Sequence, residues 1–381
     1  MLPPASILPL DGIRVIEIAQ NLAGPHAGEI LATLGADVIK VERPEGGDDA
    51  RGWGPPFAGG TAVTFHAMNR NKRGITLDLK DPAGMAELRR LLADADILIQ
   101  NMRPGMMEQM GLDADSLAAI NPRLIYCSLW AFGARGPMRL TPGYEPIVQA
   151  FAGIFSINGT PDGPPSRVGM QVLDLGTGVW AALGCMAALL QRGQTGRGTT
   201  VDVSLLETAM GWLSIYFAAF KVTGRQPQRH ASGNPNVVVF QSLPTADGEI
   251  VVAAANDRLF AKLARAVGRP DWATDPRYAS NGLRVTNKAV LLPELEAIMR
   301  TRSKADWAER LEAAGIPCAP INSLADIAAD AQLAALDIVE TIPEAGLKVV
   351  GLPLSLGGER PGIHRRAPRL GEHNADILGH D

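Results

Sequence analysis

Cysteine is scarce in this chain of 381 residues, and its scarcity limits the chemistry open to it. The three cysteines, Cys127, Cys185 and Cys318, are far apart, odd in number and form no CxxC pair. They predict neither a disulfide framework nor a zinc site. A reduced, cytoplasmic setting suits such a sequence best, and we expect no bound metal ion.

Long runs of one charge and long apolar runs are also absent. The net charge is −4 and no basic run occurs, which argues against a nucleic-acid groove but is compatible with a local patch for a phosphorylated ligand. No stretch of about 18 apolar residues is free of glycine and charge, so we expect no membrane span. The start, MLPPASILPLDG, is broken by prolines and lacks the basic region of a signal peptide.

The chain lacks the glycine fingerprints of nucleotide-binding proteins. Its first strand–helix loop is AQNLAGPHAG, without GxGxxG, and no P-loop motif occurs. A nicotinamide-dependent dehydrogenase is therefore disfavoured. The loop is compatible with a different ligand.

What the chain does contain is an alternation of short apolar strands with helices. The alternation predicts an α/β, Rossmann-like fold with a parallel sheet covered on both faces. Ligands of such sheets bind beyond the carboxyl ends of the strands. The predicted strands are 13–19, 37–42, 75–79, 96–101 and 123–129, and the predicted helices between them are 24–36 and 81–93.

The length exceeds that of one ordinary core and indicates two domains. We expect a large domain over 1–200, completed by the C-terminal 330–381, and a helical linker over 201–224. A small α+β domain is expected over 225–329. It contains a predicted hairpin that turns at Asp247-Gly248.

A single carboxylate, Asp174, stands inside the apolar stretch RVGMQVLDLGTGVWAALGCMAALLQR. The segment after Gly176 is apolar on every side, which predicts a helix buried all round. Asp174 then lies at the helix N-terminus, where free N–H groups and the helix dipole keep a carboxylate ionised. The glycines of DLGTG would let a substrate approach closely enough for N–H groups to stabilise an oxyanion. A helix N-cap and a nucleophile both fit this spacing, and one residue can serve as both.

Longer motifs resemble, in order and over nearly the whole chain, the class III CoA-transferases, the family of formyl-CoA:oxalate and carnitine CoA-transferases. They are PLDGIRVIEIAQNLAGPHAGEILATLGADVIKVERPEGGDDAR, NRNKRGITLDLK, ADILIQNMRPG, GYEPIVQAFAG, QTGRGTTVDVSLLE, LPTADG and RLGEHNADIL. The resemblance implies that Asp174 attacks an acyl-CoA thioester, giving a mixed anhydride and then an enzyme–CoA thioester, and that an acceptor acid reverses these steps. Coenzyme A is then a substrate and product, and no cofactor is permanently bound.

The resemblance also implies the binding site for coenzyme A and the neighbours of the carboxylate. Cations at this site suit the CoA phosphates, although the usual fate of such residues is a solvated surface charge. The implied CoA-binding residues are Arg43, Leu77 and Lys80 at the nucleotide end and Asn101, Met102 and Arg103 along the pantetheine arm. Ala23 is implied near the thiol end, and Tyr144 and Glu145 beside the carboxylate.

The chain departs from the formyl-CoA transferase pattern at three places. Leu22 stands where that enzyme has a glutamine, and Gln20 or Asn21 is the available substitute. Gln109 replaces a basic residue, so the phosphate contacts must differ. The flexible glycine run that closes over the carboxylate is reduced to Gly233, so any lid is built differently. These changes argue against a formyl/oxalate enzyme but leave transferase chemistry intact.

The same family contains 2-methylacyl-CoA racemases, which need two bases. The racemase histidine lies in a GHD motif, where this chain has GYE with Tyr144, a poor base at neutral pH. The racemase motif DFGGG is DLGTG here. Transferase is therefore favoured over racemase. A non-catalytic CoA-binding protein is a third alternative, and the intact aspartate argues against it.

The substrates and the assembly are expected from weaker signals. The segment RQPQRHASGNPN is basic, and we expect Arg225, Arg229 and His230 to face the distal carboxylate of an acceptor such as succinate or a C5 diacid. The alternative is that these side chains merely cover the loop. The resemblance implies an interlocked homodimer of ring-like chains, in which lid residues such as Gly233 and His230 act in cis or in trans.

Overall fold

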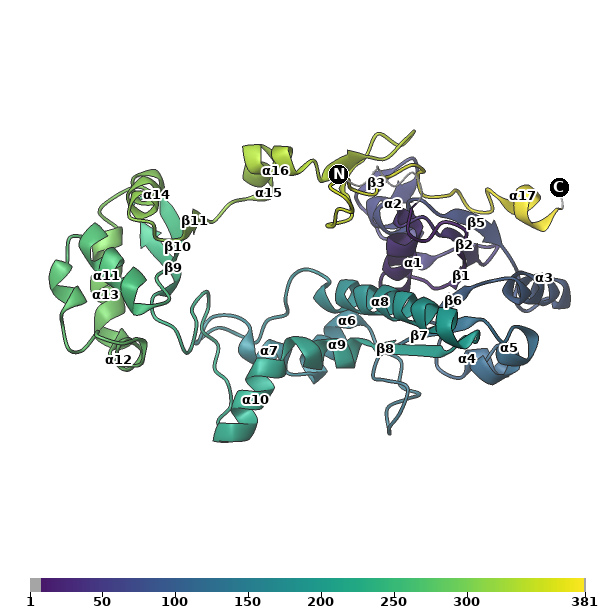
Figure 1. Cartoon of the computed structure of the whole chain (residues 1–381), viewed down its shortest axis with the longest axis horizontal. Helices are drawn as coiled ribbons and strands as arrows, with labels where there is room; N and C mark the ends of the chain where they lie inside the picture. The colour runs from purple at the N-terminus through teal and green to yellow at the C-terminus, as the bar shows by residue number, and fades with distance from the viewer. Residues whose placement is uncertain (1–7, 380–381) are drawn as a thin grey trace. The chain divides into compact units, whose positions relative to one another are not determined.

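The computed structural model describes residues 8–379, and the chain divides into two compact units (Figure 1). Unit 1 holds the described residues of Met1–Ile154, Arg167–Arg225 and Gln332–Asp381, and unit 2 holds Phe155–Ser166 and Gln226–Ala331. Each unit has its own hydrophobic core. Phe155–Ser166 thus belong to unit 2, although unit 1 flanks them on both sides in the sequence.

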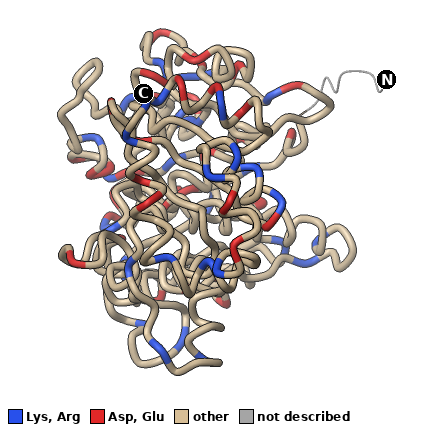
Figure 2. Tube along the Cα trace, turned by 90° about the vertical axis from the view of Figure 1, so that its left-hand side faces the viewer, with Lys and Arg blue, Asp and Glu red and all other residues tan. Residues whose placement is uncertain are grey.

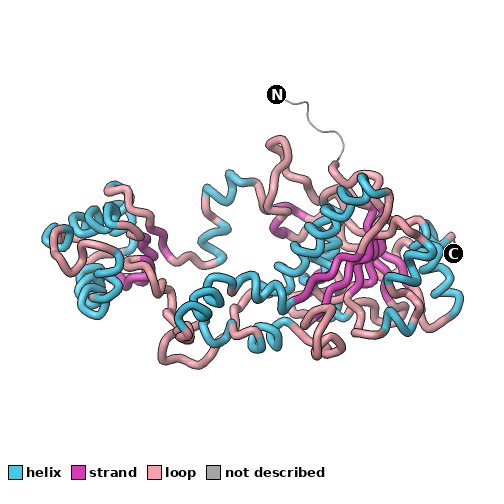
Figure 3. Tube along the Cα trace, turned by 60° about the horizontal axis from the view of Figure 1, so that its bottom comes forward, coloured by secondary structure: helices cyan, strands magenta, loops and turns pink. Residues whose placement is uncertain are grey.

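A six-stranded parallel sheet forms the centre of unit 1 (Figure 3). It confirms the parallel sheet that the alternation predicted. Its strand order is β5-β2-β1-β6-β7-β8. The strands are β1 (Arg14–Ile18), β2 (Asp37–Glu42), β5 (Arg73–Thr76), β6 (Ile97–Gln100), β7 (Ile125–Trp130) and β8 (Thr200–Ser204).

Two strands differ from the expectation. The strand expected at 75–79 ends at Thr76, because Asp78 accepts hydrogen bonds from the N–H groups of Lys80 and Asp81 and turns the chain. The segment TTVDVSLLETAMGWLSIYFAAF has the pattern of a strand that runs into an apolar helix. Its residues Val201–Ser204 belong to β8 and pair with β7, although they lie inside the bounds expected for the helical linker. The rest of that expected linker forms α9 (Leu205–Trp212) and α10 (Ser214–Thr223).

Helices cover both faces of this sheet. On one face α1 (Ala23–Thr33) and α8 (Val172–Thr195) pack on a layer that contains Val15 and Ile97. On the other face α3 (Pro82–Ala93) and α5 (Ala114–Ile120) pack on Ile16 and Leu98. Neighbouring residues of one strand therefore serve opposite layers, as the pleat of a strand requires.

The prediction that the helix after Gly176 is buried all round is wrong for α8 within this chain. One side of α8, with Ala181 and Cys185, is fully buried against the sheet. The helix is long and apolar enough to cross a membrane by length and composition, yet this side lies in the protein core. An apolar helix sequence predicts that the helix is buried, but it does not indicate whether the same chain or another molecule packs on each side. The exposed apolar side chains of α8 are Val179, Trp180, Leu183 and Leu190.

The outer edge of β5 is covered by the C-terminal part of unit 1. The Gly74 N–H donates to Nδ1 of His373 (3.1 Å), and the Gly74 carbonyl accepts from the His373 N–H (2.9 Å). The Thr76 N–H donates to Oδ1 of Asn374 (2.9 Å), at the start of α17 (Asn374–Leu378). These bonds satisfy backbone groups that an open edge strand would expose.

The remaining elements of unit 1 are short. They are α2 (Val63–Asn69), α4 (Met106–Gln109), α6 (Glu145–Phe151), a 3-10 turn at Asp49–Gly52, and the strands β3 (Phe57–Ala58), β4 (Thr61–Ala62), β12 (Val339–Thr341) and β13 (Lys348–Val350). Two further helices, α7 (Ile154–Ile157) and α16 (Ala331–Leu336), contain two of the four points where the chain passes between units.

Unit 2 is a three-stranded antiparallel sheet with helices around an aromatic core. The core includes Trp272, Tyr278 and Trp307. Thr245 pairs with Gly248, so the hairpin turns at Ala246-Asp247, one residue before the predicted position. The elements are β9 (Phe240–Thr245), β10 (Gly248–Ala253), β11 (Cys318–Pro320), α11 (Asp257–Ala266), α12 (Asn281–Thr286), α13 (Lys288–Met299), α14 (Lys304–Ala313) and α15 (Leu324–Ala328).

Charged side chains of both signs are interspersed along the chain (Figure 2), as the sequence composition suggests. Within residues 8–379 no group of three His, Cys, Asp or Glu side chains gathers in a way that would hold a metal ion. The three cysteines are free, and Cys127 and Cys185 are buried.

Candidate active site

The carboxyl edge of the sheet in unit 1 is where the predicted site residues gather. The chain runs from β1 outward to β2 and β5, and then returns to β6, β7 and β8 on the other side of β1. The order therefore reverses between β1 and β6, the position where open α/β sheets bind ligands. The loop after β1 carries Gln20 and Ala23, and the loop after β6 carries Asn101, Met102 and Arg103.

The two loops at this reversal point are joined by a reciprocal pair of hydrogen bonds. The Gln20 N–H donates to Oδ1 of Asn101 (2.9 Å), and Nδ2 of Asn101 donates to the Gln20 carbonyl (2.7 Å). Asn101 thus holds the backbone of the first loop. The family resemblance had implied a contact to the pantetheine arm instead, and this contact stays a prediction.

Asp174 lies in the first turn of α8, one helical turn before the place where this helix packs on α1. Gly178 lies one turn after Asp174, and a Cβ at Gly178 would stand 2.8 Å from the Ala23 carbonyl oxygen and 2.9 Å from His26. Residues four apart lie on the same helix face, with side chains inclined toward the N-terminus. The face of α8 that carries Asp174 therefore packs on the first turn of α1, and Asp174 lies beyond it on the N-terminal side.

The glycines of DLGTG serve helix packing, and the substrate approach that we expected of them stays a prediction. Gly178 lets α8 meet α1, and a Cβ at Gly176 would stand 2.9 Å from the ring of Trp212 in α9. Between them the hydroxyl of Thr177 is hydrogen-bonded to that of Thr208 (2.8 Å). Three helices converge at close range because these positions carry no larger side chain.

Asp174 is neither the N-cap of its helix nor an easily ionised carboxylate, so both of these expectations were wrong. The N-cap is Gln171, and Asp174 is the third helical residue. Burial, and to a lesser degree the negative charge of Glu145, raise the pKa of Asp174 from 3.8 to about 7. Among residues 8–379 the side-chain carboxyl of Asp174 forms no hydrogen bond or ion pair. The loss of hydration therefore outweighs the helix dipole here.

Glu145 is a buried carboxylate in the first turn of α6. Its Oε1 accepts from Nε2 of Gln149 (2.6 Å) and from the Leu173 N–H (3.4 Å). It thus binds the backbone of the residue next to Asp174. Tyr144, its neighbour, is 63% exposed and makes no cap hydrogen bond. The structure therefore brings Glu145 beside Asp174, as the resemblance implied.

Gln149 is a site residue that the sequence analysis missed. It is fully buried, and its Oε1 accepts from the Val168 N–H (2.9 Å) while its Nε2 donates to the Val168 carbonyl (3.4 Å) and to Glu145. It clamps the segment that leads into α8. The spacing of four residues from Glu145 on one predicted helix would have been the signal.

The nucleotide-end residues follow β2 and β5 at the same edge of the sheet. Arg43 is half-exposed and forms an ion pair with Asp49, so its guanidinium is already partly neutralised. Leu77 is buried, and its N–H donates to the Glu42 carbonyl (2.9 Å). Lys80 is exposed at the turn into α3. The structure places these residues at the expected edge, and their contact with coenzyme A stays a prediction.

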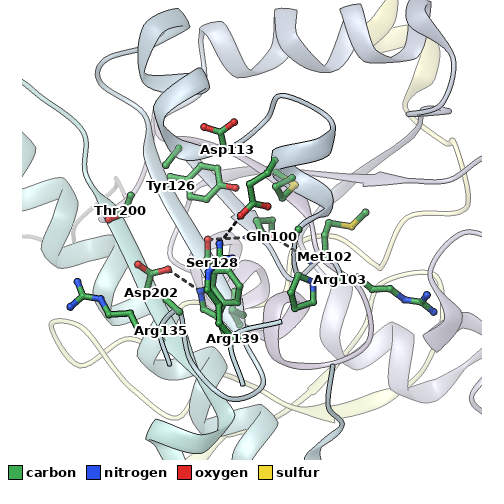
Figure 4. Close-up of a pocket in the computed structure, with 18 of the residues that line it drawn as sticks. Gln100, Met102, Arg103, Asp113, Tyr126, Ser128, Arg135, Arg139, Thr200 and Asp202 are labelled. Carbon is green, nitrogen blue, oxygen red and sulfur yellow. Dashed lines mark hydrogen bonds and ion pairs between the residues drawn. The ribbon is translucent and has the colours of Figure 1, made fainter. Parts of the chain in front are cut away.

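A cavity of about 400 Å³ opens beside Met102 and Arg103, on the sheet face that α4 and α5 flank (Figure 4). Its lining mixes both charges. Arg139 pairs with Glu108 (2.6 Å), and Asp202 accepts from Nε1 of Trp130 (2.9 Å). The side chain of Arg103 points outward from the cavity (Figure 4).

Gly233 and His230 belong to unit 2, so their predicted place beside Asp174 stays a prediction. Burial, with Lys288 as the smaller cause, lowers the pKa of His230. Arg229 donates to the carbonyls of Thr160 (2.9 Å), Pro161 (3.0 Å) and Gly163 (2.7 Å). Its guanidinium therefore holds backbone carbonyls, whereas we had expected it to face a substrate carboxylate.

Comparisons with known proteins agree with one another. A sequence profile for CoA-transferase family III matches residues 10–374. The chain is 41% identical over 379 residues to a succinate–glutarate CoA-transferase of Agrobacterium fabrum, covering 97% of this chain and 95% of that protein. It is 36% identical over 376 residues to a succinyl-CoA:glutarate CoA-transferase of Mus musculus, covering 98% and 86%. A crystal structure of a CAIB/BAIF family protein from Brucella suis superposes with a TM-score of 0.87 at 39% identity, covering 98% and 99%.

Proposed function

Since the chain belongs to CoA-transferase family III and is a CoA-transferase, we propose that Asp174 carries the transfer and that the acids exchanged are dicarboxylates. The observation that carries the proposal is the place of Asp174. It is a half-buried carboxylate with no partner cation among residues 8–379, on the face of α8 that packs at Gly178 on Ala23 of the first loop, at the reversal point of the sheet. Coenzyme A is substrate and product.

The reaction proceeds through four acyl exchanges. A carboxylate oxygen of Asp174 attacks the thioester carbonyl, the C–S bond breaks, and CoA thiolate leaves an acyl-aspartyl anhydride. The thiolate then attacks the aspartyl carbonyl and releases the donor acid as its carboxylate, giving an aspartyl-CoA thioester. The acceptor carboxylate attacks that thioester and expels the thiolate. The thiolate finally attacks the acceptor's own acyl carbon in the new anhydride, which frees Asp174 and gives the product acyl-CoA.

The raised pKa of Asp174 suits this role. A carboxylate with a pKa of about 7 is a stronger nucleophile than an ordinary one, because basicity and reactivity rise together within one class of oxygen nucleophile. The site must still lose the proton before attack. Glu145, which contributes to the raised pKa, also fixes the Leu173 N–H beside the nucleophile.

The dicarboxylate assignment rests on the relatives. The two named above are glutarate transferases that cover nearly this whole chain. We propose succinyl-CoA as donor and glutarate or another C5 diacid as acceptor. A panel of acyl-CoA donors and mono- and dicarboxylate acceptors tests this choice, and a preference of tenfold or more for monocarboxylate acceptors would contradict it.

We further propose a homodimer, supported by the open apolar face of α8, α9 and α10. The rings of Trp180 and Trp212 lie 5.9 Å apart, and Ile215 is 78% exposed. Contiguous exposed apolar groups of this kind mark interfaces. Light scattering tests the assembly. Ile215→Glu is expected to shift the protein toward the monomer, whereas a wild-type monomer at micromolar concentration would contradict the proposal.

The catalytic role of Asp174 is tested by trapping. The protein is incubated with succinyl-CoA, treated with hydroxylamine and digested, and mass spectrometry locates the hydroxamate. We expect modification at Asp174 and loss of CoA transfer in Asp174→Asn, while Asp94→Asn, an exposed carboxylate at the end of α3, serves as the matched control. Transfer at the wild-type rate by Asp174→Asn would overturn the mechanism.

A further inference from the structure

The motif NRNKRG has no role in the mechanism above, yet it is one of the segments that carry the family resemblance. It links α2 to β5, and Asn69 and Lys72 in it are fully buried. A buried lysine is uncommon because its charge loses hydration, and it requires a specific set of partners. Those partners show what the motif does.

The ammonium of Lys72 has three N–H donors, and all three are used. They point to Oε2 of Glu17 (2.7 Å), to Oδ1 of Asn69 (2.9 Å) and to the backbone carbonyl of Pro25 (2.8 Å). Burial lowers the pKa of Lys72 to about 8, with Lys40 lowering it further and Glu17 raising it. At neutral pH the side chain is mostly an ammonium, and its bond to Pro25 holds the first turn of α1.

A second buried lysine holds the start of the same loop. Nζ of Lys40 contacts the other oxygen of Glu17 (3.1 Å), Oδ2 of Asp48 (2.9 Å) and the Ala19 carbonyl (2.8 Å). The opposite oxygen of Asp48 accepts from the N–H of Asn21 (3.0 Å). Asn21 has a φ of +68°, a left-handed conformation that a non-glycine residue keeps only when its surroundings fix it.

Glu17 connects the two lysines of this buried network, since one of its carboxylate oxygens pairs with Lys40 and the other with Lys72. Helix α1 packs directly upon it. A Cβ at Gly28 would collide with the Glu17 carboxylate and stand 3.3 Å from Cε of Lys72. Two carboxylates and two ammonium groups, Glu17 and Asp48 with Lys40 and Lys72, thus form a charge-balanced set beneath the first loop.

The loop that this set holds is the one on which α8 packs at Gly178, one helical turn after Asp174. Its backbone is fixed from below at Ala19, Asn21 and Pro25, and Asn101 fixes Gln20 from the side of β6. Its last residues open α1, whose first N–H groups have no acceptor within the helix. The orientation of the loop decides where these N–H groups point relative to the thioester that Asp174 attacks.

We propose that Lys72, acting with Glu17 and Lys40, is a positioning residue for CoA transfer that holds the loop Ala19–Pro25 in its working orientation against Asp174. The inference rests on the function proposed above. Displacing reacting groups by about 1 Å costs on the order of 100-fold in rate, so a loop released from its anchors lowers kcat. It leaves the Michaelis constant for acyl-CoA nearly unchanged, because Arg43, Lys80 and Arg103 are retained.

The test compares three variants with the wild-type enzyme in the transfer of CoA from succinyl-CoA to glutarate. Glu17→Gln/Lys72→Met removes one charge of each sign, and Glu17→Asp keeps every charge but draws the carboxylate back from both lysines. The control, Asp96→Asn/Arg192→Met, removes an ion pair (2.7 Å) beside the amino end of β6, whereas the candidate site lies at the carboxyl ends of the strands. Circular dichroism and urea unfolding show which variants are folded.

We expect kcat to fall by roughly 100-fold in the double variant and by about tenfold in Glu17→Asp, with a change below threefold in KM for succinyl-CoA. The control is expected to lose stability but to keep kcat within twofold. Should folded Glu17→Asp and the folded double variant both keep the wild-type kcat, or should the control lose as much, the positioning role is wrong. If the double variant does not fold, Glu17→Asp alone decides. A wild-type enzyme without CoA transfer would overturn the proposed function instead.

Discussion

Replacing the nucleophile should make the folded protein more stable, by an amount that depends on pH. Burial, and secondarily Glu145, raise the pKa of Asp174 from 3.8 to about 7. The unfolded chain therefore releases this proton near pH 3.8, whereas the folded chain holds it to about pH 7. Between pH 3.8 and pH 7, unfolding releases the proton that Asp174 holds in the folded state. The free energy of unfolding of the wild-type protein therefore falls as pH rises.

The magnitude follows from that window. At 1.36 kcal/mol for each pKa unit, the ionised Asp174 costs the folded state roughly 4 kcal/mol above pH 7 and almost nothing near pH 4. Asp174→Asn keeps the shape and removes the charge. We therefore expect its free energy of unfolding to exceed that of wild type by an amount that grows by about 1.4 kcal/mol for each pH unit up to 7 and is constant above it.

The assay is urea unfolding followed by tryptophan fluorescence at pH 5, 6, 7 and 8, with Asp94→Asn as the control. Asp94 is exposed, so its replacement is expected to change stability by less than about 0.5 kcal/mol at every pH. If Asp174→Asn were no more stable than wild type at pH 8, or if its gain were the same at pH 5 and pH 8, the pKa of Asp174 would not be raised in the folded protein and this prediction would be wrong.

Two further predictions concern the surroundings of the nucleophile. Glu145→Gln removes the smaller cause of the raised pKa of Asp174, so the acid limb of kcat/KM should move to lower pH by roughly one pH unit. A pH–rate profile that does not move would contradict a contribution of Glu145 to that pKa. Gly178→Ala places a Cβ 2.8 Å from the Ala23 carbonyl oxygen and should destabilise the protein by about 1–3 kcal/mol and reduce transfer. The matched variant Gly193→Ala on the same helix, where nothing lies within 4 Å, should be neutral or stabilising by up to about 1 kcal/mol; equal melting temperatures for the two variants would contradict the packing argument.

Local signals sufficed for the central strands. Strand β2 occupies the predicted residues, Asp37–Glu42, because apolar residues line it and Gly35, with a φ of +107°, ends the preceding helix. The bounds of this strand depend only on residues that are neighbours in the sequence. The general rule that parallel sheets bind ligands beyond the carboxyl ends of their strands points to the edge that carries Gln20 and Asn101. The strand order and its reversal beside β1 are known only from the structure.

What the sequence could not supply are the contacts between distant segments. The pKa of Asp174 is raised by burial and, to a lesser degree, by Glu145 from a different helix. Local patterns show neither cause, so they predicted an ionised N-cap where the structure has a carboxyl with a raised pKa. The sequence gives no sign that Lys72 is buried, since its neighbours in NRNKRG are polar. Only the fold shows that Lys72 forms a buried ion pair with Glu17. The exposed side of α8 was not predicted for the same reason. An apolar side chain in the sequence does not indicate which segment or molecule packs on it.

The bonds between Gly74 and His373 have a consequence for how the protein is made. These residues are 299 positions apart, and a ribosome adding about 5–20 residues each second needs roughly 15–60 s to travel that far. Throughout this time the outer strand of a nascent sheet stays uncovered and available to other chains. Nascent unit 1 should therefore depend on chaperones during translation, and slowing the ribosome over its final third should increase aggregation even though the finished protein is unaltered.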